Sequence, residues 1–378
     1  MSSETVDSPT MHVEASTWQR DSHELYDYES RSITRASSVI QTSHRFCRRG
    51  TEVFTCEESV AEEALASVPH GQPCIDYLMN IILTGGRYLV APSDRLPATS
   101  TVQSKKLWQV VRDMGQYTLS EGDIIKLGRF KLKVRMICSE PSDSPQRPDL
   151  GMEGGSIGCA APPEVDGMPC RICLMEGTGR EEDPLIQACA CKGSIQFVHL
   201  SCLRYWIAGR LALTETSQWT YLFSHLACEL CKTPYPVQIK LADGSQCQLV
   251  PMPETKAPFI VLENLMRAEV ASDTRAVYVI SLAGKTTLKL GRGHESDVRI
   301  ADVSISRWHA TVSFTQDRRF VLEDHGSKFG TLVLIRSPVL FDNALTVQSG
   351  RTVFRLMGAG EYARYSASQD APHLSDEQ

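Results

Sequence analysis

Eight cysteine and histidine side chains between residues 170 and 231 have the types and the spacing that bind zinc. Thiolate sulfur and imidazole nitrogen suit Zn2+, and a tetrahedral structural site takes four such ligands. Eight ligands therefore fit two ions. The ligands form four closely spaced pairs, which are Cys170 with Cys173, Cys189 with Cys191, His199 with Cys202, and Cys228 with Cys231.

The lengths of the intervening segments favour an interleaved arrangement of these pairs over a serial one. The segment from Cys173 to Cys189 is long, whereas only seven residues separate Cys191 from His199. We therefore predict two structural zinc ions, each bound by two alternate pairs. The first ion is expected at Cys170, Cys173, His199 and Cys202, and the second at Cys189, Cys191, Cys228 and Cys231.

The ligand order and the run CKGSIQFVHLSCLRYW at 191–206 resemble the RING-CH (RINGv) domain of the membrane-associated RING-CH ubiquitin ligases. The PHD finger, which reads histone tails, uses the same ligand order. A single residue between Cys189 and Cys191, and Trp206 four residues after Cys202, are typical of RING-CH domains. The PHD finger instead has an aromatic residue at the position that Leu226 occupies here. The spacing thus favours the RING-CH interpretation.

This resemblance implies a RING-type E3 ubiquitin transferase. Such a protein binds a ubiquitin-conjugating enzyme and positions its ubiquitin thioester for transfer, without a covalent intermediate and therefore without a catalytic cysteine. By position, Ile172, Trp206 and Lys232 correspond to contacts with the conjugating enzyme and ubiquitin. Packing in the small core of the finger is the alternative role for Ile172 and Trp206.

A second group of polar residues lies near the C terminus, in loops between short predicted strands. Apolar runs between residues 276 and 357, separated by Gly, Asp and Ser, predict a β-sandwich. Three segments resemble the forkhead-associated (FHA) domain, which binds phosphothreonine. These segments are LKLGR at 288–292, VSISRWHA at 303–310 and EDHGSKFGT at 323–331.

The FHA resemblance implies specific roles for loop residues. Guanidinium and hydroxyl donors on loops suit a phosphate dianion with strong acceptor oxygens. Phe329 stands where the family usually has an Asn that holds the peptide backbone. The alternative to a phosphate site is an FHA fold that serves as an interaction domain without depending on phosphate. The residues expected at the phosphate are Arg292 and Ser306, with Arg307 and Lys328 adding positive charge. The residues expected to support these loops are Gly291, His309 and Gly330.

Around these sites the sequence predicts a multidomain α+β to all-β protein, with a small two-zinc cross-brace finger followed by the FHA β-sandwich. Residues 117–137 read as a β-hairpin or meander that resembles the closing strands of a degenerate FHA-like module, and Phe259 to Glu269 as a short helix. The predicted divisions are a disordered Ser/Thr-rich region at 1–66, a β-rich module at 73–138, a linker at 139–167, the finger at 168–240, a linker at 251–262, the FHA domain at 270–358 and a disordered tail at 359–378.

Composition restricts the function further. The 378 residues carry a net charge of -6, which does not indicate a nucleic-acid surface. No signal peptide and no long apolar run is visible, so we predict a protein without a membrane span, in the cytoplasm or nucleus. Unpaired thiols beside a zinc cluster agree with a reducing compartment. The cysteines outside the zinc sites are Cys47, Cys56, Cys74, Cys138, Cys159 and Cys247.

The preferred hypothesis is a soluble RING-CH-type E3 ligase whose FHA domain recruits phosphothreonine-containing substrates. The alternative is a non-enzymatic scaffold that binds phosphoproteins and uses zinc as a structural staple. A third hypothesis is that the FHA domain binds the phosphorylated N-terminal segment of the chain itself. In that segment, at residues 31–38, hydroxyl side chains follow arginines in a pattern that basic-directed kinases favour.

Overall fold

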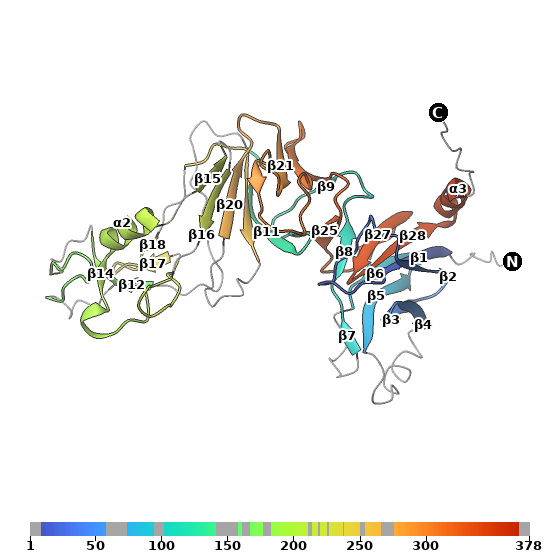
Figure 1. Ribbon diagram of the computed structural model, residues 1–378, viewed down its shortest axis with the longest axis horizontal. Coiled ribbons are helices and arrows are strands. Elements are labelled where there is room, and N and C mark those ends of the chain that lie inside the picture. Colours follow the sequence, from blue (N-terminus) through green and yellow to red (C-terminus); the bar gives the residue numbers. More distant parts are fainter. Residues whose placement is uncertain are drawn as a thin grey trace.

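The computed structural model describes residues 9–57, 74–93, 102–140, 158–160, 167–176, 183–210, 214–217, 220–224, 227–236, 238–249, 254–265 and 276–369. β-Strands are the predominant regular element among these residues, and the described part of the chain contains two α-helices. Two β-sandwiches lie side by side, and a small finger lies beyond one of them at the end of the molecule away from both termini (Figure 1).

A twelve-stranded sheet runs through both sandwiches. Its strands, in spatial order, are β15 (Thr214–Ser217), β16 (Thr220–Ser224), β20 (Ala276–Ser281), β19 (Phe259–Asn264), β11 (Phe130–Cys138), β10 (Ile124–Leu127), β25 (Thr331–Leu334), β8 (Leu107–Val110), β27 (Ala344–Ser349), β28 (Thr352–Gly358), β1 (Met11–Trp18) and β2 (Ile33–Ile40).

Two smaller sheets cover the two halves of this long sheet. The C-terminal sandwich is completed by β22 (Val298–Arg299), β21 (Thr287–Gly291), β23 (Ala310–Phe314), β24 (Phe320–Asp324) and β9 (Tyr117–Thr118). The N-terminal sandwich is completed by β26 (Val339–Leu340), β6 (Arg87–Ala91), β5 (Ile75–Thr84), β3 (His44–Arg49) and β4 (Glu52–Glu57), with β7 (Val102–Ser104) parallel to β5.

Each sandwich has its own apolar core. In β1, Met11, Val13 and Ala15 are buried and alternate with less buried residues, as expected for a strand that covers a core with one face. The core of the N-terminal sandwich also contains Phe46, Leu78 and Phe354, all at most 1% exposed. The core of the C-terminal sandwich includes Ile125, Leu132, Leu290, Val312 and Phe320.

The two sandwiches exchange their closing strands. The hairpin β10–β11 follows the N-terminal strands in sequence, yet it pairs with β25 and β19 of the C-terminal sandwich. The hairpin β27–β28 ends the C-terminal segment, yet it pairs with β8 and β1 of the N-terminal sandwich. The short strands that precede the hairpins follow the same exchange, because β9 pairs with β24 and β26 pairs with β6. Neither sandwich is therefore formed by a continuous segment of chain.

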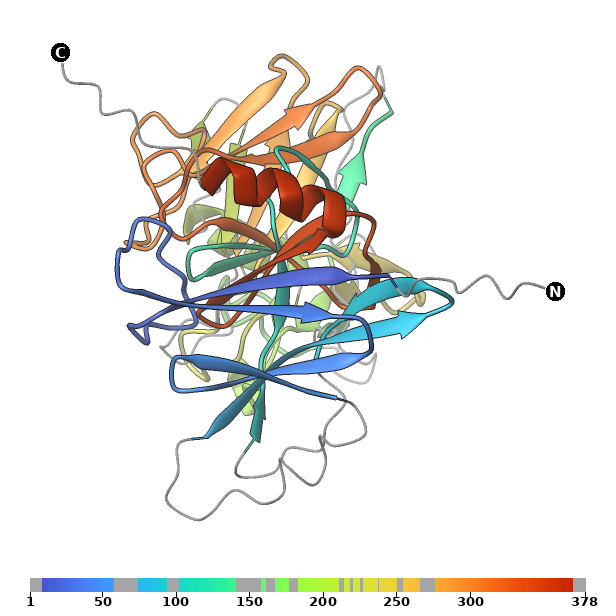
Figure 2. The same ribbon diagram turned by 90° about the vertical axis from the view of Figure 1, so that its right-hand side faces the viewer.

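Short connections account for this exchange. Strands β8 and β25 are neighbours at the centre of the long sheet. Residues 111–116 connect β8 to β9, and residues 335–338 connect β25 to β26. Through each of these short connections the chain passes directly into the other sandwich. The helix α3 (Ala359–Gln369) then packs against β28 and β1 (Figure 2). The ring of Tyr362 on this helix stacks on His12 of β1, with 3.9 Å between ring centroids.

The finger is built on a small sheet and a helix. The sheet has the order β14 (Val198–His199), β13 (Leu185–Gln187), β12 (Gly158–Ala160), β17 (Gln238–Lys240) and β18 (Gln246–Gln248). The short 3-10 helix η2 (Gly193–Ile195) precedes the helix α2 (Leu200–Arg210). Arg204 of α2 donates to the carbonyl oxygens of Leu249 at 3.1 Å and Gln248 at 2.6 Å. The apolar cluster of the finger continues to Val261 and Val279 on β19 and β20.

The fold differs from several predicted divisions. Residues 11–57 form β1–β4, although their polar composition led us to predict disorder. The prediction failed at β2 because this edge strand has only one paired neighbour, and its polar residues lie at least partly exposed. The predicted tail begins with α3, whereas residues 370–378 lie outside the described part.

The two predicted linkers also contain strands. Residues 158–160 form β12, although most of the segment 139–167 lies outside the described residues. Phe259–Asn264 is β19, which overlaps both the predicted linker at 251–262 and the predicted helix. Five of its six residues are buried, because neighbouring strands and apolar clusters cover both of its faces. Its nearly continuous apolar sequence therefore lacks the alternation that identifies a half-exposed strand.

Candidate zinc centres and phosphate site

The structure brings the eight predicted ligands together in two groups. Within each group the ligand atoms lie within 4.8 Å of one another. One group is Cys170, Cys173, His199 and Cys202, and the other is Cys189, Cys191, Cys228 and Cys231. The interleaved arrangement predicted from the spacing is therefore confirmed.

Two similar turns present the outer ligand pairs. After Cys170, the amide of Leu174 donates to the carbonyl of Cys170 at 2.8 Å, and Leu174 has a φ of 62°. After Cys228, the amide of Lys232 donates to the carbonyl of Cys228 at 2.9 Å, and Lys232 has a φ of 61°. These turns bring each cysteine pair onto one side of the chain, where both thiols converge.

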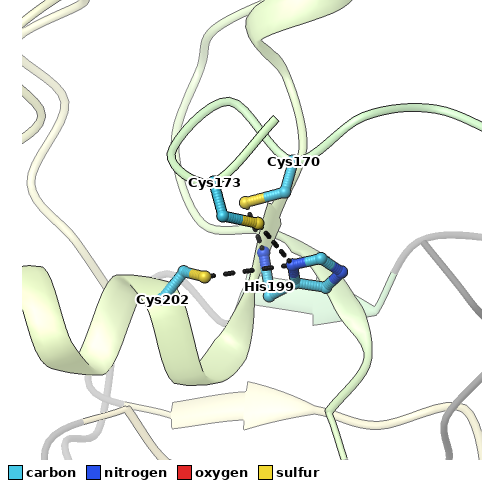
Figure 3. A group of neighbouring side chains, drawn as sticks. All are labelled: Cys170, Cys173, His199 and Cys202. Atoms are coloured by element: carbon cyan, nitrogen blue, oxygen red, sulfur yellow. Dashed lines mark hydrogen bonds between the residues drawn. The ribbon is translucent and has the colours of Figure 1, made fainter. Parts of the chain in front are cut away.

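Regular elements position the remaining ligands. His199 ends β14, and Cys202 lies in the first turn of α2 (Figure 3). The Nδ1 atom of His199 lies 3.4 Å from the Sγ atom of Cys173 and 3.9 Å from that of Cys202. The Nδ1 atom thus faces the thiols of the first group and would be the imidazole ligand of a zinc ion there, which sequence alone does not reveal.

The distances fit tetrahedral zinc. Zn–S bonds of about 2.3 Å at tetrahedral angles place sulfur atoms about 3.8 Å apart. The Sγ atoms of Cys191 and Cys228 are 3.7 Å apart. Four soft ligands per group leave no open coordination position, so both sites have the composition of structural zinc sites.

Arg171 is a residue near the metal sites that our sequence analysis missed. It lies between two ligands of the first group, but its Nη1 atom donates to Cys189 of the second group at 3.4 Å. The same guanidinium donates to the carbonyl oxygen of Ile195 at 3.1 Å and to the hydroxyl of Tyr235 at 3.1 Å. A cation beside a zinc-binding thiolate stabilises the thiolate form. Arg171 thus connects the two metal groups.

The predicted contacts for a conjugating enzyme have different environments. Ile172 is 40% exposed, although the ligand Cys170 two positions before it is buried. Lys232 is exposed at the end of the second turn. Trp206 on α2 is half-buried, and its ring meets that of Tyr235 edge to face at 6.0 Å. Further exposed apolar side chains of the finger are Leu174, Met175, Ile195, Tyr205 and Leu230.

Three loops of the C-terminal sandwich meet at the predicted phosphate site. The amide of Arg292 donates to the carbonyl of Ser306 at 3.1 Å, and the amide of Lys328 donates to the hydroxyl of Ser306 at 3.2 Å. A side chain at Gly291 would place its Cβ atom 2.1 Å from the carbonyl oxygen of Arg307, so only glycine allows this close approach. Both Arg292 and Arg307 are exposed.

His309 holds these loops together from within. The Nδ1 atom of its ring accepts from the amide of Ser306 at 3.1 Å, and the Nε2 atom lies 3.2 Å from the carbonyl oxygen of Gly330. The two contacts require a neutral ring that carries its proton on Nε2. Burial lowers the pKa of His309 and so favours this neutral form, although Asp324 opposes the shift.

Lys328 is placed by residues far away in sequence. Its Nζ atom lies 3.4 Å from Asp27 Oδ2 and 3.9 Å from Glu29 Oε2. Both carboxylates come from the connection between β1 and β2. The sequence contains no local signal for this pairing, because Asp27 and Lys328 lie 301 positions apart.

Comparison with known proteins identifies both domains. Residues 170–231 match the family model of the RING-variant domain, and residues 288–351 match that of the FHA domain. The chain therefore carries a RING-variant domain, whose two zinc sites the two ligand groups fit, and an FHA domain.

Relatives resemble part of the chain. The human E3 ubiquitin-protein ligase MARCHF8 is 31% identical over 151 residues, which are 40% of this chain and 42% of that protein. The human E3 ubiquitin-protein ligase MARCHF1 is 42% identical over 72 residues, 19% of this chain and 20% of that protein. The Saccharomyces cerevisiae ERAD-associated E3 ubiquitin-protein ligase DOA10 is 32% identical over 118 residues, 31% of this chain and 8% of that protein. The chain thus spans less than half the length of each of these relatives.

The helices give no indication of a membrane span. Among the described residues, no helix combines the length and the apolar composition that crossing a bilayer requires.

Proposed function

We propose that this protein is a RING-type E3 ubiquitin ligase that positions a ubiquitin-charged conjugating enzyme and recruits phosphothreonine-containing proteins. The finger would supply the platform for the conjugating enzyme. The C-terminal sandwich would bind the phosphorylated substrate. The relatives named as E3 ubiquitin-protein ligases support the first half of the proposal, and the FHA match supports the second half.

The exposed Ile172 is the observation that carries the ligase proposal. It is exposed in the turn between Cys170 and Cys173, and a zinc ion bound by the first group would hold the backbone of this turn in place. A rigid, exposed aliphatic side chain suits binding to an apolar patch of a partner. The cysteines of both groups are occupied as ligands, so they supply no nucleophile, and acceleration would come from positioning the thioester.

The phosphate half of the proposal is supported by the charges at the meeting point of the three loops. Arg292 is exposed, and the Ser306 hydroxyl beside it accepts a hydrogen bond and has its own proton to donate. Together they offer the charge-assisted donors that a phosphate dianion requires. His309 and Gly330 keep the loops in place.

The decisive experiment is single-turnover discharge of ubiquitin from a panel of charged conjugating enzymes. We expect the wild-type chain to accelerate discharge from at least one enzyme and Ile172→Ala to reduce that acceleration at least about fivefold, because truncating a central interface residue commonly costs more than about 1 kcal/mol. Val39→Ala is the matched control, since Val39 is an exposed aliphatic residue on the distant edge strand β2.

Zinc content and circular dichroism of Ile172→Ala must equal those of the wild type for the comparison to hold. A folded, zinc-loaded wild-type chain that accelerates no enzyme in the panel would reject the ligase proposal. In that case, a non-enzymatic scaffold that binds phosphoproteins would be the better interpretation.

A further inference from the structure

Residues 24–30, which we call the acidic segment, cross from the N-terminal sandwich to the phosphate site. They belong to the connection between β1 and β2. The amide of Tyr28 donates to the carbonyl of Lys328 at 3.0 Å. Asp27 and Glu29 place their carboxylates at the Nζ atom of the same lysine.

Apolar packing holds the acidic segment in this place. Phe329 packs in a cluster with Trp18, Leu25 and Tyr26, and its ring centroid lies 6.2 Å from that of Trp18. The next residue, Gly330, has a φ of 73°, and a Cβ atom there would lie 2.8 Å from the ring of Tyr28. The side chain at position 329 therefore docks the N-terminal sandwich and is unavailable to hold a peptide backbone.

Arg112 adds a second attachment for the same loop. Its Nη1 atom donates to the carbonyl of Ser327 at 3.1 Å, and its guanidinium lies over the ring of Tyr28 at 5.1 Å. On one side, the loop at residues 327–330 is held by the hydrogen bond that the amide of Lys328 donates to the Ser306 hydroxyl and by the contact between His309 and the carbonyl of Gly330. The acidic segment holds it on the other side. The acidic segment thus forms a wall beside the three phosphate-site loops.

The two acidic side chains of this wall have different roles. Asp27 is only 11% exposed and is the nearer partner of Lys328, so it compensates the lysine charge. Glu29 is 65% exposed and its carboxylate is farther from Nζ, at 3.9 Å. Because one lysine faces two carboxylates, the exposed Glu29 carboxylate retains negative charge that is accessible to a positively charged side chain of a ligand.

We propose that Glu29 makes the phosphopeptide site selective for ligands that carry a lysine or arginine two or three residues from the phosphothreonine. This inference rests on the proposed phosphothreonine binding. Lys328 links the two regions, because its amide donates to the Ser306 hydroxyl and its carbonyl accepts from the amide of Tyr28. Glu29 follows Tyr28 directly in the sequence. An extended peptide advances about 3.3 Å per residue, so a side chain two or three positions from the phosphothreonine lies about 7–10 Å along the peptide from it.

Fluorescence anisotropy with the full-length zinc-loaded chain tests this selectivity. Labelled phosphothreonine peptides would carry Arg, Gln or Glu at one flanking position at a time. We expect Arg to bind about two- to fivefold more tightly than Glu at one of these positions, because an exposed ion pair contributes about 0.2–1 kcal/mol. The preference should disappear in Glu29→Gln and reverse in Glu29→Lys.

Glu52→Gln is the matched control, because Glu52 is an exposed carboxylate on β4 of the N-terminal sandwich. It should leave the preference unchanged. Binding that requires Arg292 and the phosphate but shows no charge preference would overturn this inference alone. Equal tightening for every peptide in Glu29→Gln would also overturn it, because Glu29 would then compete with the phosphate. Binding that ignores both the phosphate and Arg292→Ala would reject the proposed phosphate site, and the inference with it.

Discussion

At the scale of single residues, this chain combines side chains whose partners lie within a few tens of residues with side chains whose partners lie in the other half of the sequence. The zinc ligands and His309 belong to the first kind, and their roles follow from short motifs. Lys328 and Phe329 belong to the second kind. Their surroundings come from residues 18–29 in the other half of the chain.

The buried His309 predicts a pH dependence of the phosphate-site loops. Burial holds the pKa of this ring below its value in the unfolded chain, which is about 6.5. The unfolded state therefore binds more protons at acid pH, and the stabilisation from the neutral ring is present above about pH 6.5 and lost as the pH falls. NMR of 13C-labelled histidine should find more than half of the His309 ring neutral at pH 6.5, with its proton on Nε2.

Denaturation of the C-terminal sandwich provides the corresponding stability measurement. Its denaturation midpoint should fall between pH 6.5 and pH 5, and His309→Gln should be less stable at pH 7 but show a weaker pH dependence. A His309 ring that titrates at or above pH 6.5 in the folded protein would contradict the contacts with Ser306 and Gly330.

At the scale of elements, the two metal groups stabilise turns that the short strands of the finger cannot stabilise by themselves. The elements β14, β13 and β12 are two or three residues long, and the largest apolar contribution comes from α2. Arg171 crosses between the groups, so the two sites support one another. We therefore expect metal binding and folding of the finger to be one process.

Removal of one ligand should unfold the finger and leave the sandwiches folded. Structural zinc contributes on the order of 10 kcal/mol in such small domains. Cys170→Ser or His199→Ala should lower the zinc content below two ions per chain and increase proteolysis within residues 168–240. Cys159→Ser is the matched control, because Cys159 is an exposed thiol on β12 outside both metal groups.

The sandwiches provide the independent readout in this experiment. Phosphopeptide binding should persist in Cys170→Ser and be lost only in variants of the phosphate site. Full zinc content in Cys170→Ser, or melting of the sandwiches together with the finger on chelation, would contradict this arrangement. The second outcome would mean that the apolar contacts with Val261 and Val279 couple the finger to the large sheet.

At the scale of the whole molecule, the exchanged hairpins make the two sandwiches one folding unit. The core residues Ile125, Leu127, Leu132 and Val134 reach the C-terminal sandwich from β10 and β11. Burying each such side chain contributes about 1.5–3 kcal/mol, and a domain is stable by only about 5–15 kcal/mol in total. The segment matched as an FHA domain therefore lacks a substantial part of its core when it is isolated.

Fragment complementation tests this interdependence. A fragment of residues 251–369 should show no cooperative unfolding and no phosphopeptide binding by itself. Mixing it with a fragment of residues 1–140 should restore both, because the two fragments together contain all strands of both sandwiches except β15 and β16. Cooperative folding of residues 251–369 alone, with full phosphopeptide affinity, would show that the exchange is not required.

The sequence by itself determined the two zinc groups, the FHA motifs and the predominance of β-strands after the finger. These features depend on short spacings and on strong interactions between residues whose types are distinctive. The alternation of Phe130, Leu132 and Val134 likewise predicted β11 and its buried face. In each case, the information lies within a few tens of residues.

Only the tertiary structure decided which hairpin closes which sandwich. Both hairpins are short, rich in apolar residues and turned by a Gly-Arg pair, Gly128-Arg129 in one and Gly350-Arg351 in the other. The apolar pattern of each hairpin is compatible with either sandwich. Which sandwich a hairpin joins depends on which strand edges the short connection before it can reach. The strands β1–β4 and the acidic segment were missed for the same reason. Strand β1 pairs with β28, β3 pairs with β5, and the acidic segment contacts Lys328, so their partners lie far away in sequence where no local pattern reveals them.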